Sequence, residues 1–314
     1  MNKFILGIDT SNYRTSCAFL ACDGSFWKSC GRYLEVPENS LGLRQSEALF
    51  QHVRQLPAVL KELAADLRDY EIAAVACSDR PRDAEGSYMP CFLAGKSLGE
   101  GLGELYKTPV YNFSHQHGHI AAAAFSADVE LLERPLLAWH LSGGTTELVL
   151  AEPDPECEFR VTVLGGTEDI SAGQLIDRAG VALGMPFPAG AHVEAAAGGT
   201  EGIEAFRVKI RGYDFSLSGM ENKFLAMIED GRPREDICAF VLKTVADAVL
   251  RVTKKARKEY PFPVLFSGGV AANSVLRRAF QNENDVFFAE KALCGDNALG
   301  AAVLASRSLR RKQK

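Results

Sequence analysis

The chain has 314 residues, of which 47% are hydrophobic and 24% charged, so it can bury one large or two ordinary cores. This composition excludes a disordered, collagen-like or coiled-coil protein. Its 35 Lys and Arg against 40 Asp and Glu give a net charge of −5. Any nucleic-acid site must therefore be a local patch, because there is no chain-wide basic field.

The N-terminus and the cysteines indicate a cytoplasmic protein with reduced thiols. The first residues enter a strand-like run without the charged, apolar and small-residue succession of a cleaved leader. No apolar run approaches the roughly 18 residues that a membrane span needs. The eight cysteines form no CxxC pair, which argues against a zinc knuckle or a secreted disulfide framework. We expect a cytoplasmic location and no membrane contact.

The first third of the chain is predicted to contain a sheet, a helix and a further strand. Within residues 4–20 an apolar strand, a polar turn and a second apolar strand follow one another, and a third strand-like run starts at Phe26. This succession predicts an antiparallel meander. Residues 41–67 carry apolar side chains at helical spacing, and 72–77 form a short apolar run typical of a buried parallel strand.

A similar strand-turn-strand unit follows about half a chain later. Residues 135–141 and 147–150 are predicted strands, joined by a tight turn at 142–146. Such duplication predicts two related domains that face each other across a cleft. The competing interpretation is that two common hairpins recur by chance.

The last third is predicted to contain a core helix and a strand followed by a second helix. Residues 236–260 carry one apolar stripe, which predicts a long amphipathic helix. Residues 263–266 are a predicted strand, and the turn 267–269 leads into a helix that starts at Val270.

Three of the six histidines cluster after the predicted strand at 109–113. If this stretch is helical, His115 and His119 share one face and His117 points away. Two imidazoles at this spacing can bind one metal ion, although solvated histidines at a polar helix start are the alternative. A third ligand must come from elsewhere, and Asp296, at the turn that opens a small-residue helix, is the candidate. By itself Asp296 also suits a helix N-cap.

Glycine-rich turns at 142–144 and 267–269 each follow a predicted strand. Backbone N–H groups at such turns can face a phosphate without hindrance from a Cβ atom. Together with Thr10 and Ser11 at the first turn, they predict a nucleotide site built from three loops. Either glycine turn alone would more commonly close a strand without any ligand.

Seven short segments in order resemble the TsaD family of tRNA threonylcarbamoyladenosine transferases, formerly called glycoproteases. They are ILGIDTS, SHQHGH, LSGG, TEDISAGQLIDRAGVALGMPFPAG, DFSLSG, SGGVAANSVLR and CGDNALGAA. The resemblance implies an α/β protein with a duplicated actin-like ATPase fold of the sugar kinase and Hsp70 type, with two lobes, mixed sheets and a central cleft. It places the N-terminal lobe at residues 1–112, completed by a C-terminal helix over about 295–314, and a second lobe with insertions at 113–294.

The resemblance also implies which residues form the site. His115, His119 and Asp296 would hold one divalent metal ion, with iron or zinc favoured. Asp9, Thr10 and Ser11 would be the catalytic residues of the first loop. An ATP or acyl-adenylate site would be lined by Ser142, Gly143, Gly144, Asp177, Gly190, Gly268, Gly269 and Asn273.

The implied reaction is transfer of a threonylcarbamoyl group from an adenylate to an adenosine of tRNA. The expected partners are an adenine nucleotide, tRNA, and either a second copy of the chain or a related smaller protein. One alternative is a nucleotide-binding paralogue without this activity or with another substrate, acting as a partner or regulatory protein. A metallopeptidase is the least favoured alternative, because Gln116 stands where the HExxH motif has its glutamate.

Some residues differ from the family pattern. Tyr13 and Arg14 stand where the family usually has an acidic pair, and a longer loop carries Arg80 and Arg82. These arginines could bind an additional phosphate or carboxylate, or could be solvated surface charges. The basic run at 307–314 could contact tRNA phosphates, but a frayed and solvated tail is the favoured interpretation.

Overall fold

The computed structural model describes residues 2–11, 13–36, 43–200, 202–291, 293 and 297–312. The chain divides into two compact units. Unit 1 consists of Met1–Val129, Pro153–Arg160 and Asp296–Lys314, and unit 2 consists of Glu130–Glu152 and Val161–Gly295. The first segment of unit 1 ends at Val129, whereas the lobe was expected to end at residue 112. The segment is longer because helix α3 (His115–Ala127) packs on helix α9 (Asn297–Lys312) inside unit 1.

The sheet of unit 1 begins with the predicted meander and continues with parallel strands. Its strands are β1 (Asn2–Ser11), β2 (Arg14–Ala21), β3 (Trp27–Tyr33), β4 (Tyr70–Arg80) and β5 (Val110–Ser114). Their order is β3-β2-β1-β4-β5. The first three strands pair antiparallel, whereas β1, β4 and β5 pair parallel. The antiparallel meander and the buried parallel strand are therefore confirmed.

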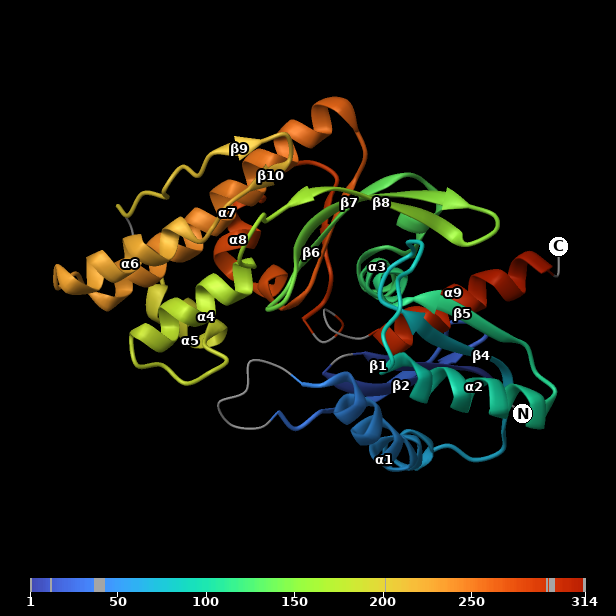
Figure 1. Ribbon diagram of the computed structural model, residues 1–314. Coiled ribbons are helices and arrows are strands. Elements are labelled where there is room, and N and C mark those ends of the chain that lie inside the picture. The colour runs from blue at the N-terminus through green and yellow to red at the C-terminus, as the bar shows by residue number, and fades with distance from the viewer. Residues whose placement is uncertain are drawn as a thin grey trace. The chain divides into compact units, whose positions relative to one another are not determined.

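Helices cover both faces of this sheet (Figure 1). Helices α1 (Gln45–Ala64) and α2 (Phe92–Tyr106) pack on one face, and α3 and α9 pack on the other. The core between the sheet and α1 and α2 is apolar, with side chains such as Leu6, Phe19 and Leu63 buried. This arrangement brings α3 and the start of α9 to the carboxyl ends of the parallel strands, which is where the site of unit 1 forms.

The sheet of unit 2 repeats this topology. Its strands are β6 (Leu136–Leu141), β7 (Thr146–Asp154), β8 (Glu158–Gly166), β11 (Val264–Ser267) and β12 (Val286–Phe288). The order β12-β11-β6-β7-β8, read from its other edge, matches that of unit 1 strand by strand. Strand β6 pairs antiparallel with β7 and parallel with β11, as β1 does with β2 and β4. The two units are thus a structural duplication, as the sequence predicted.

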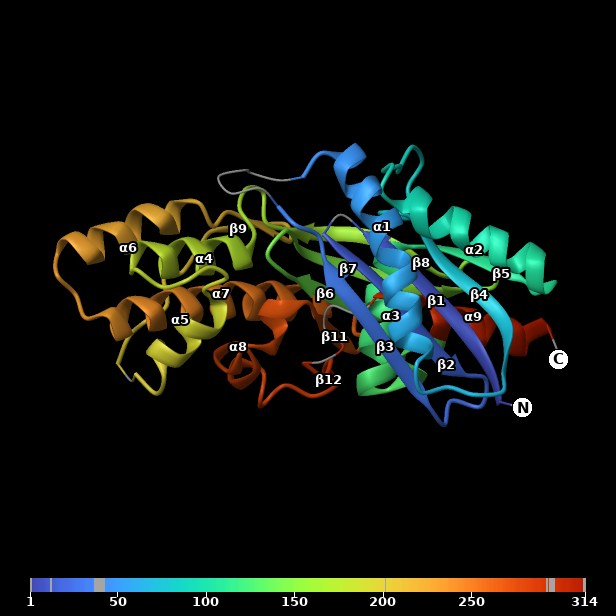
Figure 2. The same cartoon turned by 90° about the horizontal axis from the view of Figure 1, so that it is seen from below.

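The helices of unit 2 surround the long core helix. They are η1 (Val129–Glu133), α4 (Ala172–Ala182), α5 (Gly190–Ala197), α6 (Gly219–Glu229), α7 (Arg234–Glu259), η2 (Gly269–Ala272) and α8 (Ser274–Ala279). A short ribbon joins β9 (Ile210–Arg211) to β10 (Asp214–Phe215). Helices α4, α5, α6 and α7 pack on one another (Figure 2). None of the described helices is long and apolar enough to cross a membrane.

The prediction of a helix that starts at Val270 is wrong in one respect. The chain first makes the 3-10 turn η2, breaks at Asn273, and only then forms α8. The break occurs because Asn273 takes an extended backbone and its Oδ1 accepts hydrogen bonds from the backbone N–H groups of Val275 and Leu276. An asparagine in this conformation is a favourable N-cap, so it starts the helix at Ser274.

His52 of α1 is a fully buried imidazole in unit 1. Thr15 donates its hydroxyl hydrogen to Gln55 Oε1 at 2.8 Å, and the Thr15 oxygen accepts from His52 Nδ1 at 2.8 Å. Burial lowers the pKa of His52, because the charged imidazolium is poorly solvated there. The folded chain therefore binds fewer protons at this position than the unfolded chain below about pH 6.5.

We expect the stability conferred by neutral His52 to be lost as the pH falls below about 6.5. The free energy of unfolding should decline by up to about 1.4 kcal/mol per pH unit through this group. Urea denaturation between pH 7.5 and 5.5 should show a flatter dependence for His52→Gln than for the natural chain. His192→Gln, at an exposed position, is the control for the replacement of a histidine by glutamine. A slope that His52→Gln does not alter would contradict the prediction.

Candidate functional site

The candidate site of unit 1 contains a pair of histidines on the first turns of α3. Ser114 is the N-cap of this helix, and its hydroxyl accepts a hydrogen bond from the backbone N–H of His117 at 3.2 Å. His115 and His119 lie one turn apart, with their Nε2 atoms 3.1 Å from each other. The helical arrangement predicted from their spacing therefore brings both imidazoles to one point.

Asp9, near the end of β1, fixes the orientation of this pair. Its Oδ1 lies 2.9 Å from His115 Nδ1. Burial raises the pKa of the Asp9 carboxyl, but attractive interactions with neighbouring side chains, His115 first among them, bring it below its usual value. Asp9 is therefore a carboxylate that accepts a hydrogen bond from His115 Nδ1–H, and in the neutral imidazole this leaves the lone pair on Nε2. A carboxylate behind a histidine in this way is the usual support of a metal ligand.

The donor set fits a divalent metal ion. Two nitrogens bound to one zinc ion at about 2.0–2.1 Å in a tetrahedral arrangement stand roughly 3.3 Å apart. The two Nε2 atoms, at 3.1 Å, are close to this separation. In addition, Asp9 Oδ2 is buried and has no hydrogen-bond partner among the described residues. Imidazoles with a carboxylate suit iron, zinc or manganese.

The expected third ligand, Asp296, lies outside the described residues. Its neighbour Asn297 begins α9, and the structure shows how this end of α9 meets α3. A Cβ atom on Gly118 would lie 3.0 Å from the carbonyl oxygen of Asn297, and one on Gly300 would overlap the carbonyl oxygen of Gly118. The two helix backbones therefore touch beside His115 and His119.

Thr10 and Ser11 follow Asp9 on β1. Thr10 is fully buried, and its hydroxyl donates to the carbonyl of Cys91 at 3.0 Å and accepts from the N–H of Gly95 at 3.1 Å. Thr10 thus ties β1 to the start of α2. Ser11 ends the strand and is 9% exposed, so it is the more accessible of the two hydroxyls.

Unit 2 has a candidate site of its own, at the carboxyl ends of the parallel strands β6 and β11. Ser142, Gly143 and Gly144 form the turn after β6, where the Ser142 hydroxyl accepts from the N–H groups of Gly144 and Thr145 at 3.3 and 3.1 Å. Ser171, the N-cap of α4, donates its hydroxyl to the carbonyl of Gly143 at 2.7 Å. This turn is therefore held rigidly against the start of α4.

Gly268 and Gly269 form the matching turn after β11. Gly268 has a φ of +89°, and a Cβ there would overlap the carbonyl oxygen of Leu141, so the turn lies directly against the end of β6. A Cβ on Gly143, Gly144 or Gly269, in contrast, would meet nothing within 4 Å. The paired strands place both turns side by side, with backbone open to a ligand.

Asp177, Gly190 and Asn273, the other residues expected to line the nucleotide, lie at or near helix starts. Asp177 Oδ1 accepts from the N–H of Ala189 at 2.8 Å, which positions the start of α5 at Gly190. A Cβ on Gly190 would also meet nothing within 4 Å. Asn273 is the N-cap of α8, and its place beside the nucleotide stays a prediction.

Arg14 and Arg80, which lie in segments that differ from the family pattern, contact other residues of unit 1. The Arg14 guanidinium lies 5.8 Å from the ring centroid of Tyr33. Arg80 forms ion pairs with Asp79 at 2.6 Å and with Asp83 at 2.7 Å. Two carboxylates therefore already neutralise Arg80, which supports a structural role more than an extra anion site.

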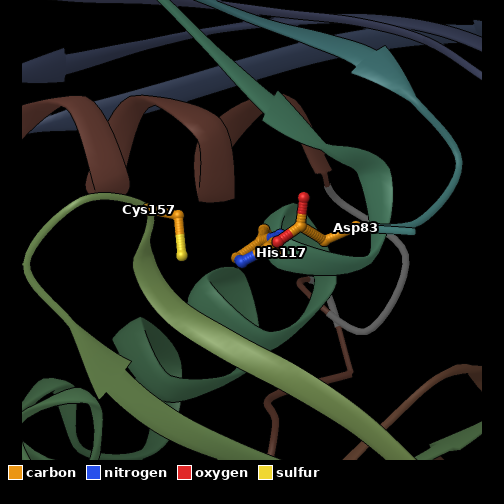
Figure 3. A group of neighbouring side chains, drawn as sticks. All are labelled: Asp83, His117 and Cys157. Carbon is orange, nitrogen blue, oxygen red and sulfur yellow. The ribbon is translucent and has the colours of Figure 1, made fainter. Parts of the chain in front are cut away.

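A group that the sequence did not single out as a metal site gathers around His117 (Figure 3). Potential ligand atoms of Asp83, His117 and Cys157 lie within 4.8 Å of one another. However, His117 Nε2 donates to the carbonyl of Phe159 at 2.6 Å, and Nδ1 pairs with the Ser114 hydroxyl at 2.6 Å. Burial, with nearby Asp154 and Asp83, raises the pKa of the Cys157 thiol to about 11. Both ring nitrogens of His117 are therefore already hydrogen-bonded, and His117 joins α3 to Phe159 of β8. The protonated Cys157 thiol contacts the carbonyl of the same Phe159 at 3.4 Å.

Comparisons with known proteins show the family to which the chain belongs. A family model described as tRNA N6-adenosine threonylcarbamoyltransferase, TsaD, matches residues 40–303. A tRNA N6-adenosine threonylcarbamoyltransferase of Streptococcus pneumoniae serotype 2 (strain D39 / NCTC 7466) is 30% identical over 313 residues. That alignment covers 95% of this chain and 90% of the relative.

Solved structures with low sequence identity show the same fold. Full-length HypF in its phosphate- and nucleotide-bound form has a TM-score of 0.64 at 15% identity, covering 98% of this chain and 56% of that one. The activator of 2-hydroxyisocaproyl-CoA dehydratase from Clostridium difficile with bound ADPNP has a TM-score of 0.53 at 14% identity. That match covers 99% of this chain and 97% of the activator.

The repeated sheet order and these likenesses define an α/β protein with the duplicated actin-like ATPase fold, which confirms the expected fold. Within that class, the chain belongs to the TsaD family of tRNA N6-adenosine threonylcarbamoyltransferases. The comparisons do not favour the alternative of a non-catalytic paralogue.

Proposed function

We infer that this chain transfers a threonylcarbamoyl group from threonylcarbamoyl-adenylate to the exocyclic amine of an adenosine in tRNA. The observation that carries this proposal is the convergence of His115 and His119 on one point with Asp9 behind them. In the reaction the amine nitrogen bonds to the carbamoyl carbon, the bond from that carbon to the AMP phosphate breaks, and one amine proton is released. Family membership supports the transfer and the tRNA acceptor.

His115 and His119, with Asp296 as the proposed third ligand, would hold one divalent metal ion, iron or zinc. Such an ion, when bound, supplies Lewis-acid polarisation and a template for the carbamoyl group. Asp9 keeps the proton of His115 on Nδ1, so that Nε2 stays available. Asp9 is therefore a positioning residue, and Thr10 holds its strand in place.

The turns after β6 and β11 would bind the adenylate. The backbone is open at Gly143, Gly144, Gly190 and Gly269, so a phosphate can approach these turns without hindrance from a Cβ atom. Asp177 orients the start of α5 in this arrangement. We assign the chain mainly a positioning role, because holding two substrates together lowers the entropic part of the barrier.

We propose that the reaction takes place in the cytoplasm, where tRNA is the acceptor. We also propose a protein partner, either a second copy of this chain or a related smaller protein. Analytical ultracentrifugation of the purified chain, alone and with a candidate smaller protein, tests the second proposal, and a monomer in both samples would contradict it.

The direct test of the reaction is a transfer assay. Purified protein loaded with iron or zinc is mixed with threonylcarbamoyl-adenylate and an unmodified tRNA transcript, and the digested nucleosides are analysed by mass spectrometry. We expect threonylcarbamoyladenosine from the natural chain and none from His115→Ala. Equal product with and without the protein would contradict the proposal.

Nucleotide binding by the turn after β6 gives a separate prediction. In Gly144→Val the new side chain would fill open space next to the backbone N–H groups. We expect the affinity for ATP and AMP to fall about 10-fold, as for the loss of roughly 1.4 kcal/mol, with no change in melting temperature. Gly219→Val, at an equally open glycine that starts α6, is the matched control. Unchanged calorimetric affinity in Gly144→Val would contradict the assignment.

A further inference from the structure

Unit 1 has a pocket at the end of its sheet opposite Asp9. Its volume is about 670 Å³, and it is lined by the amino ends of β1 and β4, the connection after α2, and the last turns of α9. Lys3 and Ser11 lie near opposite ends of β1, about 26 Å apart at roughly 3.3 Å per residue. The pocket is therefore separate from the histidine site.

Cationic side chains predominate among the charged groups of this pocket. Lys3, Lys107 and Arg310 line it, and Glu71 is the single acidic residue among the described lining residues. The cations come from three different elements: β1, the residue that ends α2, and α9. This local concentration of positive charge is notable because the chain as a whole carries a net charge of −5.

The ion pairs that these cations make inside the protein are weak. Lys3 Nζ lies 3.3 Å from Glu71 Oε1, and these side chains are 59% and 47% exposed. Lys107 pairs with Glu104 at 3.3 Å, with both side chains more than 80% exposed. Exposed pairs contribute only about 0–1 kcal/mol. A phosphate can therefore compete for both lysines.

The C-terminal basic residues are ordered as a helix, contrary to the frayed tail that the sequence favoured. Helix α9 continues to Lys312, and Arg310 Nη2 donates to the carbonyl of Cys22 at 3.0 Å. Lys312 Nζ lies 5.0 Å from the ring centroid of Tyr111. The end of α9 and the start of β1 lie at the same end of unit 1 in both views (Figures 1 and 2). Arg310, one of the three pocket cations, is thus held in place by the protein itself.

We propose that this pocket binds backbone phosphates of the tRNA substrate. The assignment rests on the proposed function, which makes tRNA the acceptor. Backbone phosphates are the usual partners of Lys and Arg in protein–nucleic acid complexes, and they position the nucleic acid without reading its sequence. The pocket lies about 20 Å along β1 from Asp9, at roughly 3.3 Å per residue between Lys3 and Asp9. A tRNA is longer than this distance, so one molecule can contact both places.

The test measures the affinity of the full-length chain for an unmodified tRNA transcript by fluorescence anisotropy at several salt concentrations. In the triple variant Lys3→Gln, Lys107→Gln, Arg310→Gln, we expect affinity about 10- to 100-fold lower at low salt. The slope of the logarithm of the association constant against the logarithm of the salt concentration is negative. Its magnitude should decrease by about 2–3, because each lost phosphate contact reduces that magnitude by roughly 0.7–0.9. Lys258→Gln, an exposed lysine of unit 2, is the control for a change in charge alone.

A second variant gives an effect of the opposite sign, which misfolding cannot imitate. Glu71→Gln removes the acidic group of the pocket, so we expect tRNA to bind about 2- to 5-fold more tightly. Weaker binding by the triple variant together with tighter binding by Glu71→Gln supports the proposal. A triple variant that binds tRNA as the natural chain does overturns it and leaves the proposed function intact.

Two further outcomes are informative. One distinguishes RNA phosphates from small phosphate compounds, and the other distinguishes failure of this proposal from failure of the proposed function. If inorganic phosphate or AMP binds in a way that the triple variant abolishes, while tRNA affinity is unchanged, the pocket serves a small phosphate compound and the RNA assignment is overturned. If the natural chain binds no tRNA at any salt concentration, the failure lies in the proposed acceptor itself.

Discussion

Purified His115→Ala is expected to contain no stoichiometric metal and to lose threonylcarbamoyl transfer by at least about 1,000-fold. The physical reason is that His115 supplies one of the two Nε2 atoms that stand 3.1 Å apart, and a single imidazole on α3 cannot hold the ion. Elemental analysis of iron and zinc, followed by the transfer assay, measures both effects. Gln116→Ala, on the same helical turn, is the matched control and should retain metal.

Asp9→Asn gives an intermediate result that distinguishes a positioning residue from a ligand. The amide oxygen can still accept from His115 Nδ1, but it carries no charge to support the imidazole. We expect metal affinity to fall about 10- to 100-fold without complete loss. Full metal content in His115→Ala would contradict the assignment of the histidine pair.

Gly300→Ala is expected to destabilise unit 1 by about 3 kcal/mol or more and to weaken the metal site as a consequence. A Cβ at position 300 would overlap the carbonyl oxygen of Gly118 and approach the Gly118 Cα to 2.9 Å. The atoms in its way belong to the backbone of α3, so the clash can be relieved only by moving one helix away from the other. Because α3 carries both histidines, separating α3 from α9 displaces them. Urea denaturation and metal content measure the two effects.

Gly101→Ala is the control for this glycine substitution. Gly101 lies in α2, and a Cβ there meets nothing within 4 Å. Alanine in a helix interior should therefore raise the free energy of unfolding by about 0.5–1 kcal/mol. If Gly300→Ala unfolded at the same urea concentration as the natural chain, the close crossing of α3 and α9 would be contradicted.

Local sequence patterns predicted most of the fold. Short apolar runs bounded by polar turns located β1, β2, β4, β6 and β7, and the apolar stripe located α7 within two residues at its start. The spacing of His115 and His119 predicted their meeting because both lie on one helix, where geometry depends only on sequence separation. The duplication was predicted because two strand-turn-strand units, each with Thr, Ser or Gly at its turn, recur about half a chain apart.

Contacts between distant segments could not be predicted in the same way. Asp9 and His115 are 106 positions apart, and only the parallel sheet brings them together. The hydrogen bonds between the Thr10 hydroxyl and the backbone of Cys91 and Gly95 depend on where α2 starts. The N-cap role of Asn273 was not predicted, although asparagine is a strong N-cap, because the apolar run after Gly269 indicated one continuous helix.

The central claim, a metal-assisted threonylcarbamoyl transfer to tRNA, is tested most directly in cells. A strain whose own tRNA N6-adenosine threonylcarbamoyltransferase can be switched off would express either this chain or its His115→Ala variant. The measurement is the amount of threonylcarbamoyladenosine in digested total tRNA, determined by mass spectrometry. We predict that the natural chain restores the modified nucleoside and the variant does not. Folded, metal-loaded chain with no modified nucleoside in the tRNA would contradict the account.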